Sequence, residues 1–140
     1  MSLACAAIYV RCLRRNGKYS CQLIFARSKL LPENITQPRA ELIAAYLNTH
    51  TGEVVRRSLS KYHEYSTKLT DSKITLSWIN NMDIPLKPWV RNRVIEITRF
   101  TDSNSWMHVS GDNMVADLGT RRYATIDDIL PNSKCDVELP

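Results

Sequence analysis

A strand gives way to a helix within one short stretch of the chain, Leu69-Thr70-Asp71-Ser72-Lys73-Ile74-Thr75-Leu76-Ser77-Trp78-Ile79. The residues that lead into this stretch predict a short strand over 65–69. The Thr-Asp-Ser triplet then supplies side chains that are common at helix N-caps. Apolar residues at 74, 76, 78 and 79 come next, at positions that favour a helix. The sequence therefore predicts that Asp71 lies at the junction between a strand and a helix.

The segment upstream of this junction is predicted to form a hairpin. Residues 3–11 and 19–27 are runs of β-forming residues, and Asn16-Gly17 between them is a strong signal for a hairpin turn. The second strand partly alternates. Its expected common face is made of Tyr19, Cys21, Leu23 and Phe25, with Ser20 and Gln22 on the other face.

A helix is predicted to follow the hairpin. Pro38 suits the first residue of a helix, and Gly52 suits its end. A further helical piece is expected over 54–61.

Helices and strands continue to alternate downstream of the junction. Residues 89–100 have helical spacing, with Val90, Val94 and Ile97 on one side. A short strand is expected over 106–109, and short helices over 114–118 and 125–130. The resulting order, β-β-α-β-α-α-β-α, predicts an α/β fold in which a mixed sheet is flanked by helices.

Length and composition fit one globular domain. The chain has 140 residues, of which 44% are hydrophobic and 24% are charged. These values exclude a disordered tail, a collagen-like repeat and a coiled coil. The uncharged, largely apolar stretch over residues 1–10 is about half the length of a membrane-spanning helix. We expect no membrane partner.

The charge is unevenly distributed. Residues 1–123 hold 18 Lys and Arg against 10 Asp and Glu, whereas residues 124–140 hold one base and four acids. A basic body suits a polyanion such as nucleic acid, and a solvated surface explains the same excess equally well.

The four cysteines are predicted to be small apolar residues. Cys5, Cys12, Cys21 and Cys135 form no C-x-x-C pair and have no histidine cluster nearby, so a zinc site is not expected. They favour a reducing, intracellular compartment.

Three acidic residues stand among apolar neighbours. Each has a simple structural explanation: Glu41 and Asp71 suit helix N-termini, and Asp117 suits a pair with Arg121 four residues later.

Together these acids lie within motifs that resemble the ribonuclease H-like segment of retroelement polyproteins, most nearly the Bel/Pao type. The first motif is Pro38-Arg39-Ala40-Glu41-Leu42-Ile43-Ala44-Ala45, and the second is the strand–helix stretch over 69–79. The third is Val90-Arg91-Asn92-Arg93-Val94-Ile95-Glu96-Ile97. The fourth is His108-Val109-Ser110-Gly111-Asp112-Asn113-Met114-Val115-Ala116-Asp117-Leu118-Gly119-Thr120-Arg121. The resemblance covers residues 2–130, and residues 131–140 are expected to form a C-terminal tail.

The resemblance implies a fold, a reaction and a site. Members of the family have a ribonuclease H-like mixed sheet and cut the RNA strand of RNA–DNA hybrids with two Mg²⁺ ions. Carboxylate oxygens are the ligands that Mg²⁺ prefers. By resemblance, Glu41, Asp71 and Asp117 are the catalytic residues and metal ligands. Neighbouring reverse transcriptase and integrase segments of the polyprotein are implied partners, in the cytoplasm and within virus-like particles where the element is active.

One expected ligand has no counterpart here. The family has a fourth carboxylate, an Asp on a central first strand, and residues 2–11 match the segment that comes just after that Asp. No acid precedes Glu33. We therefore expect a sheet without its central first strand, an incomplete metal site, and little or no nuclease activity for this chain alone.

Other residues are candidates for nucleic-acid contacts by position. They are Arg39 and Ser72 beside the acids, and Lys87, Arg91 and Arg93 on or near the helix over 89–100. A solvated helix face explains the last three equally well. Of the tryptophans, Trp78 and Trp106 are expected to be at least partly buried and Trp89 to be exposed.

Two alternative functions remain open. The chain could be a non-catalytic remnant that binds nucleic acid or connects neighbouring polyprotein domains. It could also be a host protein with a related fold, such as a resolvase or integrase-like domain, although the order of the motifs argues against this.

Overall fold

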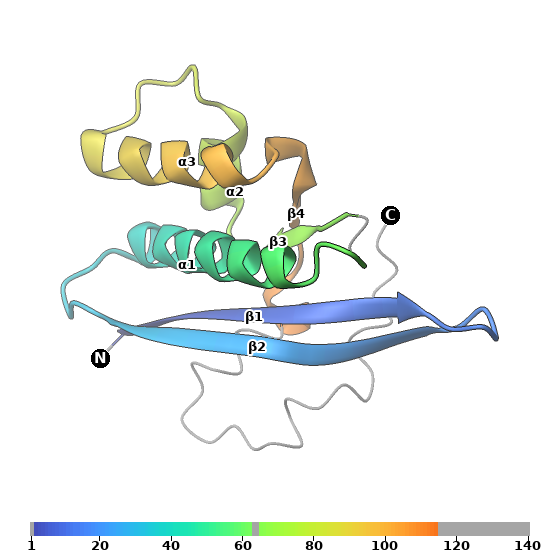
Figure 1. Cartoon of the computed structure of the whole chain (residues 1–140). Coiled ribbons are helices and arrows are strands. Elements are labelled where there is room, and N and C mark those ends of the chain that lie inside the picture. The colour runs from blue at the N-terminus through green and yellow to red at the C-terminus, as the bar shows by residue number, and fades with distance from the viewer. Residues whose placement is uncertain (1, 63–64, 115–140) are drawn as a thin grey trace.

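A computed structural model of the chain describes residues 2–62 and 65–114 (Figure 1). Its elements are β1 (Ser2–Leu13), β2 (Tyr19–Leu31), α1 (Gln37–Ser58), β3 (Lys68–Thr70), α2 (Lys73–Asn80), α3 (Pro88–Phe100), η1 (Ser103–Ser105), β4 (Trp106–His108) and η2 (Gly111–Asn113). The predicted mixed α/β class and the order of these elements are confirmed. The helices predicted over 114–118 and 125–130 lie, apart from Met114, outside the described residues.

The N-terminal hairpin forms around the predicted turn. Gly17 has a φ of 77°, a conformation that glycine adopts without strain. Its N–H donates to the carbonyl oxygen of Arg14 at 3.0 Å. The Lys18 N–H donates to Asn16 Oδ1, also at 3.0 Å. The Asn-Gly pair therefore sets the turn, and the antiparallel strands on either side are longer than the sequence predicts.

A bulge overturns the predicted common face of the second strand. Ile8 pairs with Phe25 and Tyr9 pairs with Leu23, so Ile24 is an extra residue in β2. The extra residue turns the side chains beyond it to the opposite face. Phe25 is accordingly 48% exposed, whereas Leu23 is half-buried.

Helix α1 runs through the position where the sequence predicts its end. It spans 22 residues and includes both Gly52 and part of the separate piece predicted over 54–61. A glycine inside a helix costs about 1 kcal/mol. Packing of the preceding turn offsets this cost, because Thr49 and Thr51 are both buried. The helix also begins at Gln37, so Glu41 is its fifth residue and lies outside the first turn, where the sequence places it.

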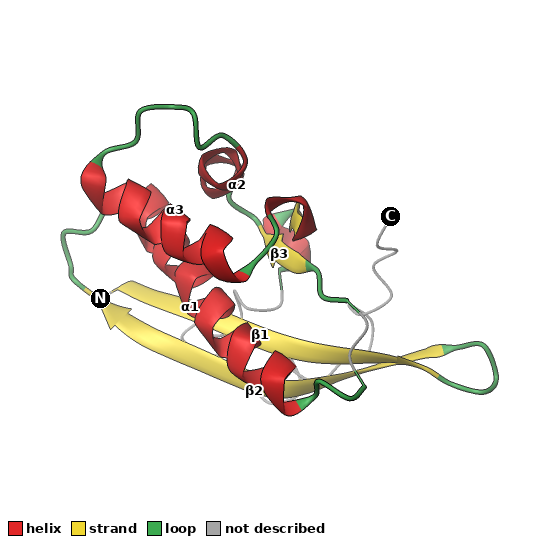
Figure 2. Ribbon diagram, turned by 45° about the horizontal axis from the view of Figure 1, so that its top comes forward, coloured by secondary structure: helices red, strands yellow, loops and turns green. Residues whose placement is uncertain are grey.

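Helix α1 packs between the hairpin and the other helices (Figure 2). One side carries Leu42 and Ala45 into the main core, whose other buried members are Ile79, Val90, Val94, Ile97 and Trp106. Leu47 and Thr51 are buried about half a turn away around the helix. The Ala4 and Ala6 side chains of β1, which α1 contacts, are buried as well. Two opposite faces of α1 are therefore covered.

The strands form two separate pairs. β1 and β2 are antiparallel, whereas β3 and β4 are parallel and align Lys68 with Trp106 and Thr70 with His108. Among residues 2–62 and 65–114, no ladder of hydrogen bonds joins one pair to the other.

Candidate functional site

The predicted junction holds Asp71 at the carboxyl end of β3. Ser72 caps α2: its buried hydroxyl accepts a hydrogen bond from the Thr75 N–H at 3.1 Å. The Thr70 hydroxyl accepts one from the Ser72 N–H at 3.2 Å. These bonds fix the backbone on both sides of Asp71, whose own side chain is exposed.

The segment after β4 lies against Asp71. The Val109 N–H donates to the Thr70 carbonyl oxygen at 3.0 Å and so extends the β3–β4 pairing by one residue. A Cβ atom placed on Gly111 would lie 3.7 Å from Asp71 Oδ2. Two motifs that are about 40 residues apart in the sequence are therefore adjacent. Asp117 follows Gly111 in the chain, but it lies outside the described residues.

Glu41 is half-buried in the N-terminal part of α1. Its Oε1 accepts a hydrogen bond from Gln37 Nε2, one turn earlier, at 3.1 Å. In the part of the chain that the structure describes, no group of three His, Cys, Asp or Glu side chains is arranged to hold a metal ion. The convergence of Glu41, Asp71 and Asp117 on one site stays a prediction.

The two described acids have the chemistry that a hard cation requires. Neither Glu41 nor Asp71 forms an ion pair with a Lys or Arg among residues 2–62 and 65–114. Their oxygens are therefore not neutralised by the protein there, and carboxylate oxygen is what Mg²⁺ prefers.

The candidate nucleic-acid contacts fall into separate groups. Ser72 is 4% exposed, and its hydroxyl is engaged in capping α2. Lys87 and Arg91 are exposed at the start of α3. Capping therefore accounts for the Ser72 hydroxyl, and its contact with a substrate is tested by the Ser72→Ala variant below. The roles of Lys87 and Arg91 in binding stay predictions.

Arg39 and Arg93 meet at one aromatic ring. The Arg93 guanidinium carbon lies 3.6 Å from the centre of the Trp89 ring, and that of Arg39 lies 5.0 Å from it. Arg93 Nη1 also donates to the Trp89 carbonyl oxygen at 3.0 Å. Trp89 is half-buried against the core, so the prediction that it is exposed is wrong. Trp78 and Trp106 are partly and fully buried, as predicted.

The comparisons with known proteins identify the family. A family model described as the Pao retrotransposon-like RNaseH-like domain matches residues 2–75. The chain belongs to this family. The match includes Glu41 and Asp71, and it ends within α2, before α3 and the Gly111 loop. No curated protein and no solved structure shows significant similarity to the chain.

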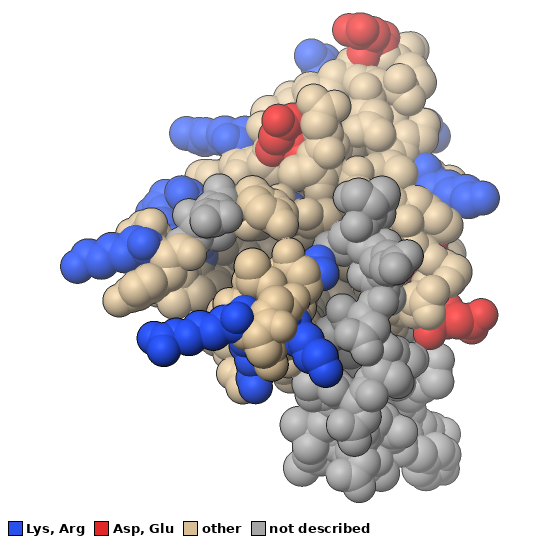
Figure 3. All heavy atoms as spheres, turned by 90° about the vertical axis from the view of Figure 1, so that its right-hand side faces the viewer, with Lys and Arg blue, Asp and Glu red and all other residues tan. Residues whose placement is uncertain are grey.

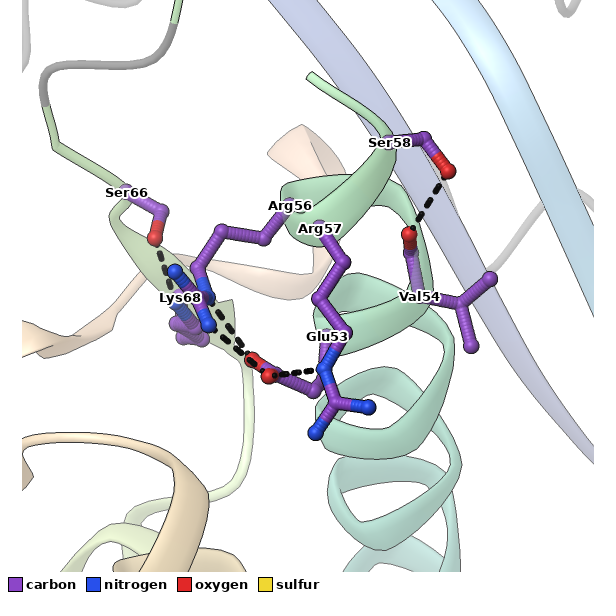
Figure 4. Close-up of polar contacts among 7 residues, drawn as sticks. All are labelled: Glu53, Val54, Arg56, Arg57, Ser58, Ser66 and Lys68. Atoms are coloured by element: carbon purple, nitrogen blue, oxygen red, sulfur yellow. Dashed lines mark hydrogen bonds and ion pairs between the residues drawn. The ribbon is translucent and has the colours of Figure 1, made fainter. Parts of the chain in front are cut away.

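This RNaseH-like domain also contains a charged cluster that sequence reasoning missed. Arg56 and Arg57 near the end of α1 both bind Glu53 at 2.8 Å (Figure 4). Hydrogen bonds from Arg56 and then Arg57 lower the pKa of Glu53 to about 2. Lys68 of β3, whose ammonium donates to Ser66 Oγ at 2.7 Å, stands beside them. Burial and then the nearby Arg56 lower the pKa of Lys68.

The cluster borders a polar pocket between α1, the start of β3 and the end of α3. The spacing of Glu53 from Arg56 and Arg57 is a signal for helix ion pairs that the sequence offers. The approach of Lys68 depends on tertiary packing and has no such signal. No helix in the described part of this chain is long and apolar enough to cross a membrane.

Proposed function

We propose that this domain is the ribonuclease H module of a Pao-type retroelement polyprotein, and that its substrate is the RNA strand of an RNA–DNA hybrid. The position of Asp71 supports the proposal most strongly. It lies at the end of β3, within the family match, and against the Gly111 loop that leads to Asp117. The neighbouring segments of such a polyprotein, reverse transcriptase and integrase, are the proposed partners.

Glu41, Asp71 and Asp117 are the residues that would hold divalent ions. Bound Mg²⁺ would activate a water molecule for attack and stabilise the oxygen that leaves. Neighbouring residues of this chain position Asp71. The Thr70–Val109 hydrogen bond and the Ser72 cap fix the backbone beside Asp71.

We propose that the chain alone has little or no nuclease activity, because it supplies only three of the four carboxylates that the family uses. Fewer negative charges offset two divalent ions less completely, so the ions would bind more weakly.

Arg39, Lys87, Arg91 and Arg93 are proposed to contact the hybrid. Arg39 and Arg93 approach Trp89 from α1 and α3. A retained basic surface of this kind also supports the alternative function, a non-catalytic remnant that binds nucleic acid.

A cleavage and binding assay tests the proposal. The chain is incubated with Mg²⁺ and a labelled RNA–DNA hybrid, and single-stranded RNA and double-stranded RNA serve as controls. We expect the hybrid to be bound and to be cut slowly or not at all. Robust cleavage that Asp71→Asn abolishes would contradict the proposed inactivity and support the nuclease class. Hybrid affinity that is the same with and without Mg²⁺, and the same in Asp71→Asn, would favour the non-catalytic alternative.

A further inference from the structure

The far end of the hairpin projects beyond the helix that covers its base. Gly52, near the end of α1, lies opposite Ile8 of β1: a Cβ on the glycine would be 3.9 Å from Ile8 Cδ1. Beyond that point the strands continue for several residues, and every residue from 11 to 19 is exposed. Figure 1 shows this part, which we call the arm (residues 11–19), extending past the end of α1.

The arm is basic along its whole length. It contains Arg11, Arg14, Arg15 and Lys18, and it contains no Asp or Glu. None of these cations forms an ion pair with another part of the chain that the structure describes. Figure 3 views the molecule from this end. Several Lys and Arg side chains point outward from the lower part of that face, and the acidic side chains in view lie elsewhere.

The arm is ordered by its own turn. The Arg14 N–H donates to the Lys18 carbonyl oxygen at 2.8 Å, in addition to the hydrogen bonds made by the Gly17 N–H and by Asn16 Oδ1. The Arg11 guanidinium carbon lies 3.8 Å from the centre of the Tyr19 ring. An isolated two-stranded ribbon is at best marginally stable in water. The hydrogen bonds order the backbone of the turn that carries the cations, and the ring contact orders the Arg11 side chain, before any partner binds.

We propose that the arm binds the sugar–phosphate backbone of a nucleic-acid duplex. Three of its four cations are arginines, whose planar guanidinium groups match phosphate oxygens in a bidentate geometry. A two-stranded ribbon is also narrow enough to enter the major groove of B-form DNA. The inference rests on the proposed function only for the class of partner, since an RNaseH-like domain acts on nucleic acid.

An anionic membrane is the less suitable partner. Peripheral membrane segments combine basic residues with apolar side chains that enter the lipid. The arm exposes only two large apolar side chains, Leu13 and Tyr19, and Arg11 covers one face of the Tyr19 ring. Charge dominates its surface.

The arm lies far from Glu41, the candidate acid on α1. Helix α1 and strand β1 run in the same direction, and the arm is at the end of α1 that is remote from Glu41 (Figure 1). From Glu41 to Gly52 the helix rises about 16 Å, and from Ile8 to Arg14 the strand rises about 20 Å. The resulting separation of about 35 Å corresponds to about ten base pairs of a duplex. A duplex of twenty base pairs can therefore reach both places.

Salt-dependent binding to such duplexes tests the proposal. Fluorescence anisotropy measures the Kd of the full chain for a twenty-base-pair DNA duplex and for an RNA–DNA hybrid between 50 and 200 mM KCl. The arm variant carries Arg14→Gln, Arg15→Gln and Lys18→Gln. The control carries Arg27→Gln, Lys29→Gln and Lys61→Gln, which remove the same charge from exposed positions elsewhere.

We expect the arm variant to bind about tenfold or more weakly than the wild type, with a slope of log K against log salt that is smaller by about 2 to 3. The control should change both quantities much less. In the wild-type chain, a bound duplex should protect Lys18 from acetylation more than Lys29 or Lys61. This measurement uses the wild-type chain, so it does not depend on whether a variant folds.

Three results would overturn the proposal: equal losses in the two variants, an unprotected Lys18, or binding of the wild-type chain to phosphatidylserine vesicles but to neither duplex. A separate measurement, divalent-ion binding at Asp71, tests the proposed function. The arm substitutions should leave that binding unchanged.

Discussion

Replacing Ser72 by alanine shows whether its hydroxyl stabilises the fold or contacts the substrate. The Ser72 hydroxyl is buried and accepts the Thr75 N–H at 3.1 Å. Loss of an N-cap of this kind costs about 1 kcal/mol, and a buried N–H without a partner costs about 1–3 kcal/mol. These two costs describe the same lost bond, so we expect Ser72→Ala to lower the free energy of unfolding by about 1–2 kcal/mol. For a domain of this size the melting temperature falls by about 3–6 °C.

Urea unfolding followed by circular dichroism measures this loss. Ser77→Ala is the matched control, because Ser77 is exposed on the same helix and alanine favours helix there. We expect the control to stay within about 0.5 kcal/mol of the wild type. Below the unfolding transition, Ser72→Ala should bind a hybrid with wild-type affinity. Wild-type stability together with weakened hybrid binding would refute the reasoning, because the hydroxyl would then contact the substrate.

Three further predictions concern the core and the charged clusters. Ile97→Ala, at a fully buried position of the core, should lower the free energy of unfolding by about 2–5 kcal/mol in urea; a loss below about 1 kcal/mol would mean that this core is loosely packed. Glu53→Gln should cost about 0.5–1 kcal/mol at pH 7, since the exposed arginines are screened by solvent. The pKa of Glu53 is lowered to about 2, so its contribution is present above its ordinary pKa of 4.5 and is lost as the pH falls toward 2. The difference between Glu53→Gln and the wild type should therefore shrink as the pH falls from 5 to 2 and vanish below pH 2, and a difference that stays constant over this range would contradict the ion-pair explanation. Trp89→Leu removes the ring that Arg39 and Arg93 approach, and should cost about 1–2 kcal/mol in a thermal melt, whereas an unchanged melt would show that these contacts contribute nothing.

Local signals in the sequence predicted the elements whose structure is decided locally. Asn16-Gly17 sets the turn, Ser72 caps α2, and the spacing of Val90, Val94 and Ile97 gives the buried side of α3. Each depends on a few neighbouring residues, so the sequence alone was sufficient.

The errors arose where packing outweighs local preference. Gly52 does not end α1, because the turn before it is buried and the Glu53 ion pairs with Arg56 and Arg57 support the turn after it. Ile24 forms a bulge that strict alternation cannot reveal, and it moves Phe25 to the other face. Trp89 is partly covered because it packs against the core and because Arg39 approaches its ring from another helix, in addition to Arg93 of its own helix. No short-range pattern contains these contacts.

The candidate site likewise contains features that local sequence decides and features that tertiary packing decides. The strand–helix junction at Asp71 is predictable from its flanking residues. The approach of Gly111 to Asp71 depends on the parallel pairing of β3 with β4, which no local signal in the sequence reveals. The cluster of Glu53 with Lys68 has no local signal for its tertiary part either, since it joins a helix to the start of a strand.

Paramagnetic broadening by Mn²⁺ tests the central claim most directly, because it locates a divalent-ion site even where binding is weak. Low concentrations of Mn²⁺ are added to the ¹⁵N-labelled chain, and amide signals are followed by NMR. We predict that signals around Glu41, Asp71 and Gly111 broaden first, and that Asp71→Asn greatly reduces this effect. Broadening centred on Glu53 or Asp102, or broadening around Asp71 that persists unchanged in Asp71→Asn, would contradict the assignment of these carboxylates to a metal site.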